Sequence, residues 1–428
     1  MVHTPLFVRT IFAAIVAITL FAPALPTTAW AERDPFSRRT VTRTSNAGLS
    51  PCAKELAVYR RARRGYDRAA NAYWSAIDKK RRTRKAKARK NKPITKHDYV
   101  RSHPPKYTGP RWPKCASTGT RSTSSKPRST IGVVSDFRRA AKKHYGFVPR
   151  HTSERGYKQA YAREALAVGL NAELVVGVYA LETGGLGPYA RQSGIFLTDQ
   201  KCRAIAAKGR AASTALGYAQ LLAANSAAMT ALKGHEFAAR LEQRAARAGP
   251  ARAKELRAKA RALRLMARDV KRGIRRYKNR NGWREYVKFS KTSKGYAVHA
   301  VNLDADIGPL LQVHKLLKIK RFAQKKGFRS ITSAELELMN LVGPGRGAEM
   351  MRRVAADAAT ANFFSRKGYM RNPVAKGLTA RQLLGKLEAI IAKKKKKCGS
   401  VEFQMAFDDV ARSRVRATRP KRERLGLN

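Results

Sequence analysis

The stretch that decides the fold is 170–222. It reads LNAELVVGVYALETGGLGPYA over residues 170–190 and, after a polar segment, STALGYAQLL over residues 213–222. Asn171 is a favoured helix N-cap. Gly184 lies where the apolar pattern stops, and glycine there is typical of a helix end. The first half of the stretch therefore predicts a short helix that ends in a glycine turn.

The predicted helix carries one carboxyl group on an apolar face. Val175, Val178, Tyr179 and Glu182 recur at i, i+3, i+4 and i+7. Desolvation and the negative end of the helix dipole would both raise the pKa of Glu182. A carboxylic acid that stays protonated near neutral pH is the general acid that cleavage of a glycosidic bond requires. The alternative is a surface glutamate at a fraying helix end without a chemical role.

Four short motifs follow one another along the chain. ETGG at 182–185 ends the predicted helix, and Ser213, Ala215, Gly217 and Gln220 form S-x-A-x-G-x-x-Q. A looser third motif, with the residues Asn302, Asp306, Ile307 and Gly308, opens a predicted helix, and MNLVGPGRG spans 339–347. Together they resemble the soluble lytic transglycosylase family, which has the goose-type lysozyme fold. The resemblance covers roughly Val133 to Ile390, with insertions.

Two departures from the family pattern lie in the last motif. Met339 stands where the family usually has tyrosine, and one extra residue separates Asn340 from Gly343. The tyrosine contact of the family is therefore not carried over to this chain.

The resemblance implies that the protein cleaves the β-1,4 bond between N-acetylmuramic acid and N-acetylglucosamine in peptidoglycan. Glu182 would act as acid and then as base, giving a 1,6-anhydro product. No second acidic residue accompanies the motifs, so the resemblance implies that the acetamido group of the substrate assists. The implied substrate-binding residues are Gln220, Asn340, Ser213, Gly217 and Tyr218. No cofactor is expected.

Two other functions remain open. A hydrolytic muramidase would use water in place of the muramyl hydroxyl, with Asp199 as a candidate to position it. A non-catalytic, basic envelope-binding protein on a lysozyme-like core is the second alternative. The presence of Glu182 and Gln220 favours an enzyme. Met339 mildly favours the non-catalytic hypothesis.

The N-terminus predicts export. Residues 1–31 contain Arg9, an apolar run and the sequence Ala29-Trp30-Ala31, which together are typical of a secretory signal peptide. The apolar run is shorter than the roughly 20 residues that a membrane span needs. We therefore expect a periplasmic or secreted protein without a stable membrane span; a retained N-terminal anchor is the alternative.

The composition is strongly basic. Lys and Arg number 91 against 28 Asp and Glu, giving a formal charge of +63. Such a charge requires polyanionic partners or counterions. For an exported chain we expect peptidoglycan and anionic envelope polymers, bound through a basic, partly disordered N-terminal arm. Nucleic acid is not expected as a partner, although tyrosines beside the basic run at 79–92 leave single-strand binding as an alternative.

Four cysteines suit an oxidising compartment, and the local pairing Cys52–Cys115 with Cys202–Cys398 is expected. Free thiols are the alternative. The spacing of histidines and cysteines contains no metal-binding motif, so no metal site is expected.

The remaining chain predicts a mainly α fold, because apolar residues recur at helical spacing and strand signals are sparse. We divide it into a signal peptide (1–31), a basic arm and linker (32–130), a lysozyme-like domain (131–397) and a basic C-terminal tail (398–428). A basic helical insertion is expected at about 227–298. Its apolar stripe, which favours packing on the core over docking on a membrane surface, comprises Leu256, Ala260, Leu263, Ala267, Val270 and Ile274.

Overall fold

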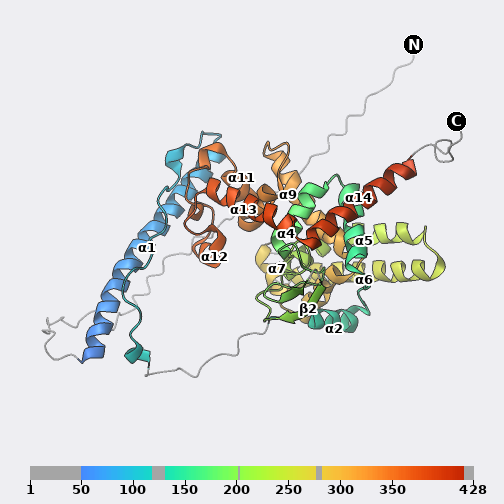
Figure 1. Ribbon diagram of the computed structural model, residues 1–428, viewed down its shortest axis with the longest axis horizontal. Coiled ribbons are helices and arrows are strands. Elements are labelled where there is room, and N and C mark those ends of the chain that lie inside the picture. Colours follow the sequence, from blue (N-terminus) through green and yellow to red (C-terminus); the bar gives the residue numbers. More distant parts are fainter. Residues whose placement is uncertain (1–49, 118–130, 201–202, 276–281, 419–428) are drawn as a thin grey trace, which may run out of the picture.

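A computed structural model describes residues 50–117, 131–200, 203–275 and 282–418, and for 117, 196–200, 203–208 and 416–418 it describes the backbone alone. Within these residues the chain is mainly helical, as expected, with one two-stranded hairpin (Figure 1). The expected signal peptide, residues 32–49 and 118–130 of the expected arm and linker, and the last ten residues lie outside the described residues. Cys202 lies outside them as well, and with it the expected Cys202–Cys398 pairing. No helix in the described part has the length and apolarity to cross a membrane.

The described residues contain α-helices, one pair of strands and several short 3-10 helices. The first α-helices are α1 (Pro51–Arg89), α2 (Val134–Tyr145), α3 (Glu154–Ala167), α4 (Ala172–Thr183), α5 (Ala223–Ala245), α6 (Pro250–Arg275) and α7 (Trp283–Phe289). The later ones are α8 (Ser293–His299), α9 (Gly308–Lys325), α10 (Ser333–Val342), α11 (Pro344–Met350), α12 (Arg366–Arg371), α13 (Ala380–Lys395) and α14 (Cys398–Thr418). The strands β1 (Phe196–Gln200) and β2 (Arg203–Lys208) pair antiparallel, and short 3-10 turns, including η3 (Lys114–Ser117) and η6 (Thr360–Asn362), connect several helices.

Helix α4 lies in the middle of the core. It is buried on almost every side rather than on one face, because Leu174, Val176 and Ala180 add apolar surface to the predicted stripe. Helices α10, α13 and α14 pack around it. Gly177 allows α10 to approach closely, since an added Cβ there would lie 2.2 Å from Ser333 Oγ. The glycine thus fixes the contact between the two helices that form the candidate site.

Within the segment where a basic helical insertion was expected, α5 and α6 form a hairpin, drawn at the right of Figure 1. The whole predicted stripe of α6 is buried, much of it against α5, so packing within the protein is confirmed over exposure to a membrane surface. Lys259, buried on α6, contacts Asp304 at 2.8 Å and Asp306 at 2.7 Å, just before α9. These ion pairs hold the hairpin on the core.

Helix α1 continues through the basic run at 79–89, within the arm that was expected to be partly disordered. Acceptors from other segments offset the repulsion between its charges: Arg84 is buried and bonds the Glu349 carboxylate and the Asp98 carbonyl. Ile77, also buried, packs with Phe363. Part of the expected basic arm is therefore joined to the C-terminal half of the chain.

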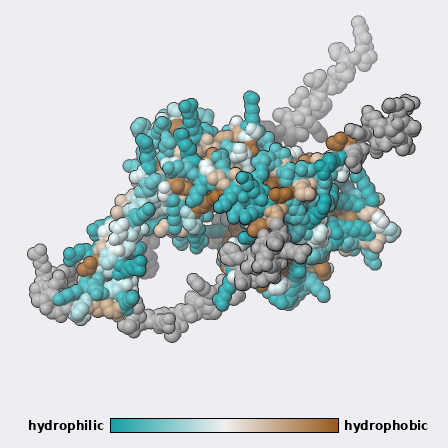
Figure 2. Space-filling model, in the orientation of Figure 1, coloured by the Kyte–Doolittle hydropathy of each residue, from teal (hydrophilic) through white to brown (hydrophobic). Residues whose placement is uncertain are grey.

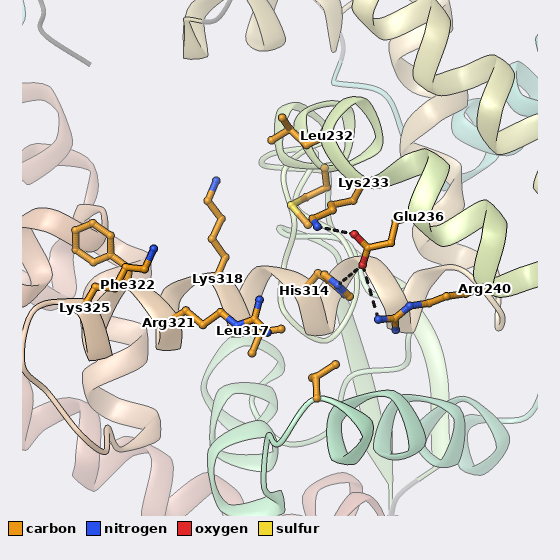
Figure 3. A pocket seen from close by; sticks show the side chains of 12 residues that line it. Leu232, Lys233, Glu236, Arg240, His314, Leu317, Lys318, Arg321, Phe322 and Lys325 are labelled. Carbon is orange, nitrogen blue, oxygen red and sulfur yellow. Dashed lines mark hydrogen bonds and ion pairs between the residues drawn. The ribbon is translucent and has the colours of Figure 1, made fainter. Parts of the chain in front are cut away.

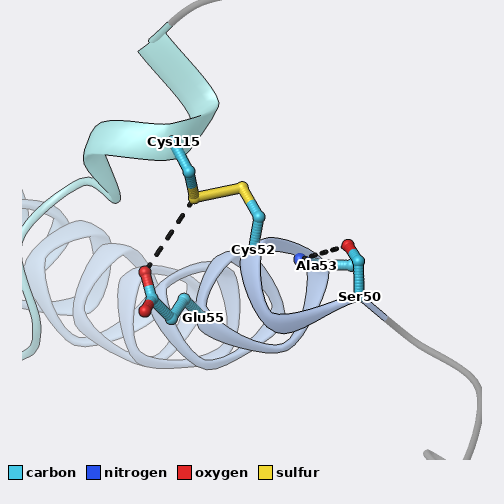
Figure 4. The surroundings of a disulfide bond; sticks show 5 residues. All are labelled: Ser50, Cys52, Ala53, Glu55 and Cys115. Carbon is cyan, nitrogen blue, oxygen red and sulfur yellow. Dashed lines mark hydrogen bonds between the residues drawn. A yellow bond between two sulfur atoms is a disulfide. The ribbon is translucent and has the colours of Figure 1, made fainter.

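The expected Cys52–Cys115 disulfide is present (Figure 4). It joins the first turn of α1 to η3, so it closes the extended segment that returns along the helix.

The C-terminal tail differs from expectation in its first half. Residues 398–418 form α14, and its Phe403 is fully buried against Tyr161, Tyr179 and Tyr218. Ala406 and Phe407 are buried as well, so this part of α14 belongs to the core. Residues 355–365 consist mostly of turns.

Candidate active site

Glu182 lies at the end of α4, as the sequence predicted. The Asn171 side chain accepts a hydrogen bond from Leu174 N at the start of the helix, and Gly184 closes it with φ of +75°. The Glu182 side chain is half-buried. The local sequence therefore accounts for its position along the helix.

Two residues of α10 face Glu182. Asn340 Nδ2 donates to Glu182 Oε1 at 2.8 Å and to Glu337 Oε2 at 3.1 Å. Glu337 is 3% exposed. A single amide group thus bridges two carboxyl groups, one half-buried and one buried.

The electrostatic surroundings favour protonation of both carboxyl groups. Burial raises the pKa of Glu182, while Lys315 and the hydrogen bonds from Glu337 and Asn340 partly oppose the rise. Burial and the neighbouring Glu182 raise the pKa of Glu337 well above its usual range. Both carboxyl groups thus bind protons more tightly than ordinary glutamates, and Glu337 does so more strongly than Glu182.

The 213–222 loop is tied to this pair through side chains. Lys315 Nζ, from α9, donates to the Ala219 carbonyl at 3.0 Å. Gln220 has φ of +41°, an uncommon backbone conformation for a residue with a side chain, and its Nε2 donates to the carbonyls of Arg191 and Gly217. Arg191 in turn donates to the Thr183 carbonyl beside Glu182. The structure therefore brings together the loop motif, Glu182 and Asn340.

The other expected substrate-binding residues have structural contacts. Tyr218 is 1% exposed and its hydroxyl donates to Glu154 at 2.6 Å, which corrects the expectation that it contacts substrate. Ser213 Oγ accepts from Ala215 N within the loop. Gly217, with φ of +83°, lies against Gln312, so a side chain there would clash.

Residues of the weaker motifs are also placed. Asn302 is buried and donates to Ser226 Oγ, and Gly308 begins α9 as the motif predicted. Met339, in the place of the family tyrosine, is buried against Gly347 of α11. Asp199 pairs through its backbone with Ala204 in the hairpin, and its side chain lies outside the described ones.

A separate cavity of 560 Å³ lies between α5 and α9 and does not include Glu182 (Figure 3). Its only acidic lining residue, Glu236, is shared by Lys233, Arg240 and His314. The α9 wall adds three exposed cations that form no ion pair within the described part of the chain: Lys318, Arg321 and Lys325. The cavity is therefore strongly basic.

Sequence reasoning missed Glu337 and Lys315. Glu337 stands within the apolar run LELMNLV, three residues before Asn340, and this spacing places both on one face of a helix. A lone carboxyl group in an apolar helix was the available signal. Nothing in the sequence indicated Lys315, because its charge acts on carboxyl groups of α4 and α10 and its Nζ bonds the 213–222 loop, all far from it in sequence.

No group of three or more His, Cys, Asp and Glu side chains in the described residues is arranged to hold a metal ion. Comparison with known proteins gives no match to a family model, to a curated protein or to a solved structure. The function of this protein is therefore inferred from the geometry of the site and from the sequence motifs.

Proposed function

We propose that this protein is a peptidoglycan lytic transglycosylase that cleaves the β-1,4 bond between N-acetylmuramic acid and N-acetylglucosamine. The observation that carries the proposal is the carboxyl group of Glu182, half-buried at a helix end with a raised pKa. It bonds Asn340 directly, and Arg191 connects the Thr183 carbonyl beside it to the Gln220 side chain of the 213–222 loop. A general acid needs this combination of protonation and partial access.

Cleavage would begin with transfer of the Glu182 proton to the glycosidic oxygen, which leaves with the departing sugar. The substrate's acetamido group would stabilise the sugar carbon from which that oxygen departs. The Glu182 carboxylate would then accept the proton of the muramyl 6-hydroxyl as its oxygen attacks that carbon. This sequence regenerates the acid and gives a 1,6-anhydro product without consuming water.

Gln220 and Asn340 support this chemistry mainly by positioning groups around Glu182. Gln220 uses its amide donor on the carbonyls of Arg191 and Gly217, which orders the loop beside the acid. Asn340 uses its two N–H groups on the two carboxyl groups. Each side chain keeps a carbonyl oxygen as the acceptor it offers to a substrate hydroxyl or amide.

The basic surface would hold the enzyme on the anionic cell wall. Exposed cations of α1 and of the cavity wall on α9 carry part of the formal charge of +63. Together with the signal peptide indicated by the sequence, this charge fits a periplasmic or secreted enzyme that acts on a polyanionic substrate.

The test is a digest of purified peptidoglycan with product masses, comparing wild type with Glu182→Gln. Gln is nearly isosteric and cannot supply the proton, so the rate should fall by about 10²–10⁴ or more. Anhydro products, each lighter by one water than the reducing muropeptide, should vanish in the variant.

Two outcomes would contradict the proposal. Reducing products would indicate the hydrolytic muramidase and direct attention to Asp199. If wild type is inactive, or if Glu182→Gln is fully active, the non-catalytic envelope-binding protein becomes the better hypothesis.

A further inference from the structure

The bridged carboxyl groups have fewer hydrogen-bond donors than two anions need. Asn340 Nδ2 has two N–H groups and gives one to each carboxyl group. Glu337 Oε1 is buried and receives no hydrogen bond from any of the described residues. A buried carboxylate oxygen without a donor is strongly unfavourable, whereas a carboxylic acid at this position becomes a donor itself.

The charges around Glu337 lead to the same conclusion. The ionisable groups that face it are Glu182 from α4, Lys315 from α9 and Tyr161 from α3. Among the described residues, Lys315 is the cation whose charge acts on both carboxyl groups, and it also donates to the Ala219 carbonyl. Two carboxylates would leave one negative charge in excess, and the more deeply buried Glu337 is the group that neutralisation favours.

We propose that Glu337 is a positioning residue that stays protonated throughout the reaction and donates a hydrogen bond to Glu182. The inference rests on the proposed function, since it assigns a role at the same site. Asn340 Nδ2 bonds an oxygen of each carboxyl group, so it holds the two side chains next to each other. A buried carboxylic acid kept neutral at pH 7 is known as a hydrogen-bond donor in other enzyme sites.

The proton count of the reaction is unchanged by this role. When Glu182 gives its proton to the leaving oxygen, the new carboxylate receives hydrogen bonds from Glu337 and Asn340. When Glu182 takes the proton of the 6-hydroxyl, those bonds remain. Glu337 neither gains nor loses a proton, and its contribution is to hold and stabilise the Glu182 carboxylate between the two steps.

The decisive comparison is Glu337→Gln against Glu337→Leu. Gln is neutral and keeps an N–H donor, so it imitates the protonated acid, and kcat should stay within about threefold of wild type. Leu has a similar volume and no donor, so kcat should fall by about 10- to 100-fold, the usual effect of losing a hydrogen bond to a charged group. If Gln is as impaired as Leu, an ionised Glu337 is required and the proposal is wrong. If Leu is as active as wild type, Glu337 does not position Glu182.

A second measurement is independent of activity. The raised pKa of Glu337 means that the folded state binds its proton more tightly than the unfolded state. Its stabilising effect is therefore complete below the unfolded pKa, near 4.3, and is lost as pH rises toward the folded pKa. The melting temperature of wild type should fall relative to that of Glu337→Gln by at least about 2 °C between pH 5 and 8.

If the melting temperatures of wild type and Glu337→Gln change in parallel across that pH range, the fold does not hold Glu337 neutral. The two proposals fail separately. Loss of the pH effect leaves Glu182 as the acid, whereas full activity of Glu182→Gln removes the enzymatic function but not the protonation of Glu337.

Discussion

At the scale of the residue, the candidate site is defined by hydrogen bonds that join three side chains from two helices. Asn340 is the common partner, and it lies 158 residues from Glu182 in the sequence. It was expected to hold substrate, and in the structure its amide nitrogen is occupied by the two carboxyl groups. Its role is therefore tested through its effect on Glu182.

Asn340→Ala should lower kcat by about 10- to 100-fold, because each hydrogen bond to a charged group contributes about 1.5–3 kcal/mol. Since the Asn340 bond lowers the pKa of Glu182, its loss should also move the alkaline limb of the pH–rate profile, where Glu182 loses its proton, to higher pH. A pH profile of kcat on peptidoglycan checks both. Asn372→Ala is a control. Within the described residues, the Asn372 side chain bonds only the Gly368 carbonyl of α12. If the pH–rate profile of Asn340→Ala equals that of wild type, Asn340 does not affect the protonation of Glu182.

At the scale of the element, the site depends on how closely α4 and α10 approach. Gly177 on α4 meets Ser333 on α10, and Glu337 lies one turn beyond Ser333 on the same helix face. A change in the helix separation would therefore move Asn340 and Glu337 away from Glu182. Packing and chemistry are coupled through this contact.

Gly177→Ala should destabilise the fold by about 1–3 kcal/mol, because the added methyl group overpacks the interface. It should also lower kcat, since the carboxyl groups would separate. Adding Ser333→Gly should restore both, because it removes the Oγ and Cβ atoms that the methyl would meet. Denaturant unfolding and kcat provide the two measurements.

The matched control for that substitution is Gly385→Ala. Gly385 is exposed within α13 and an added Cβ would meet no atom within 4 Å. Alanine there should stabilise the protein by about 0.5–1 kcal/mol through helix propensity. Equal destabilisation by Gly177→Ala and Gly385→Ala would remove the interface explanation.

At the scale of the whole molecule, charge dominates the surface. The face drawn in Figure 2 is mostly hydrophilic with small, scattered apolar patches, and basic residues outnumber acidic ones 91 to 28. Because many of the exposed cations lie apart from the carboxyl pair, binding to the wall should be separable from catalysis. Ionic strength is the direct probe of such binding.

Retention on purified peptidoglycan should fall sharply as salt rises past about 0.15 M, where the Debye length is about 8 Å. Removing exposed cations Lys318, Arg321 and Lys325 should weaken retention about as much as removing Arg60, Arg61 and Arg64 of α1, because diffuse attraction depends on net charge. A much larger effect of the α9 changes would indicate a specific polymer site in the α5–α9 cavity. Salt-insensitive retention would exclude the electrostatic mechanism.

Several elements were predictable because their signals are local. The N-cap Asn171 and the glycine turn set the limits of α4, and the apolar stripe of α6 predicted its buried face. The prediction of a C-terminal tail was wrong for residues 398–418, because burial of Phe403 depends on tyrosines from α3, α4 and the 213–222 loop. The prediction of a partly disordered arm was wrong for α1, because Arg84 bonds acceptors far along the chain.

The sequence by itself determined a mainly helical chain, the helix that ends at Glu182 and the glycine-containing loop that follows it. Caps, periodicity and glycine conformations act within a few residues, so they can be recognised without the fold. Only the tertiary structure decided that Glu337 and Lys315 join Glu182, and that Tyr218 is a core residue. Burial and the proton affinity of a carboxyl group depend on neighbours from distant segments, and the periodicity of one segment does not encode them.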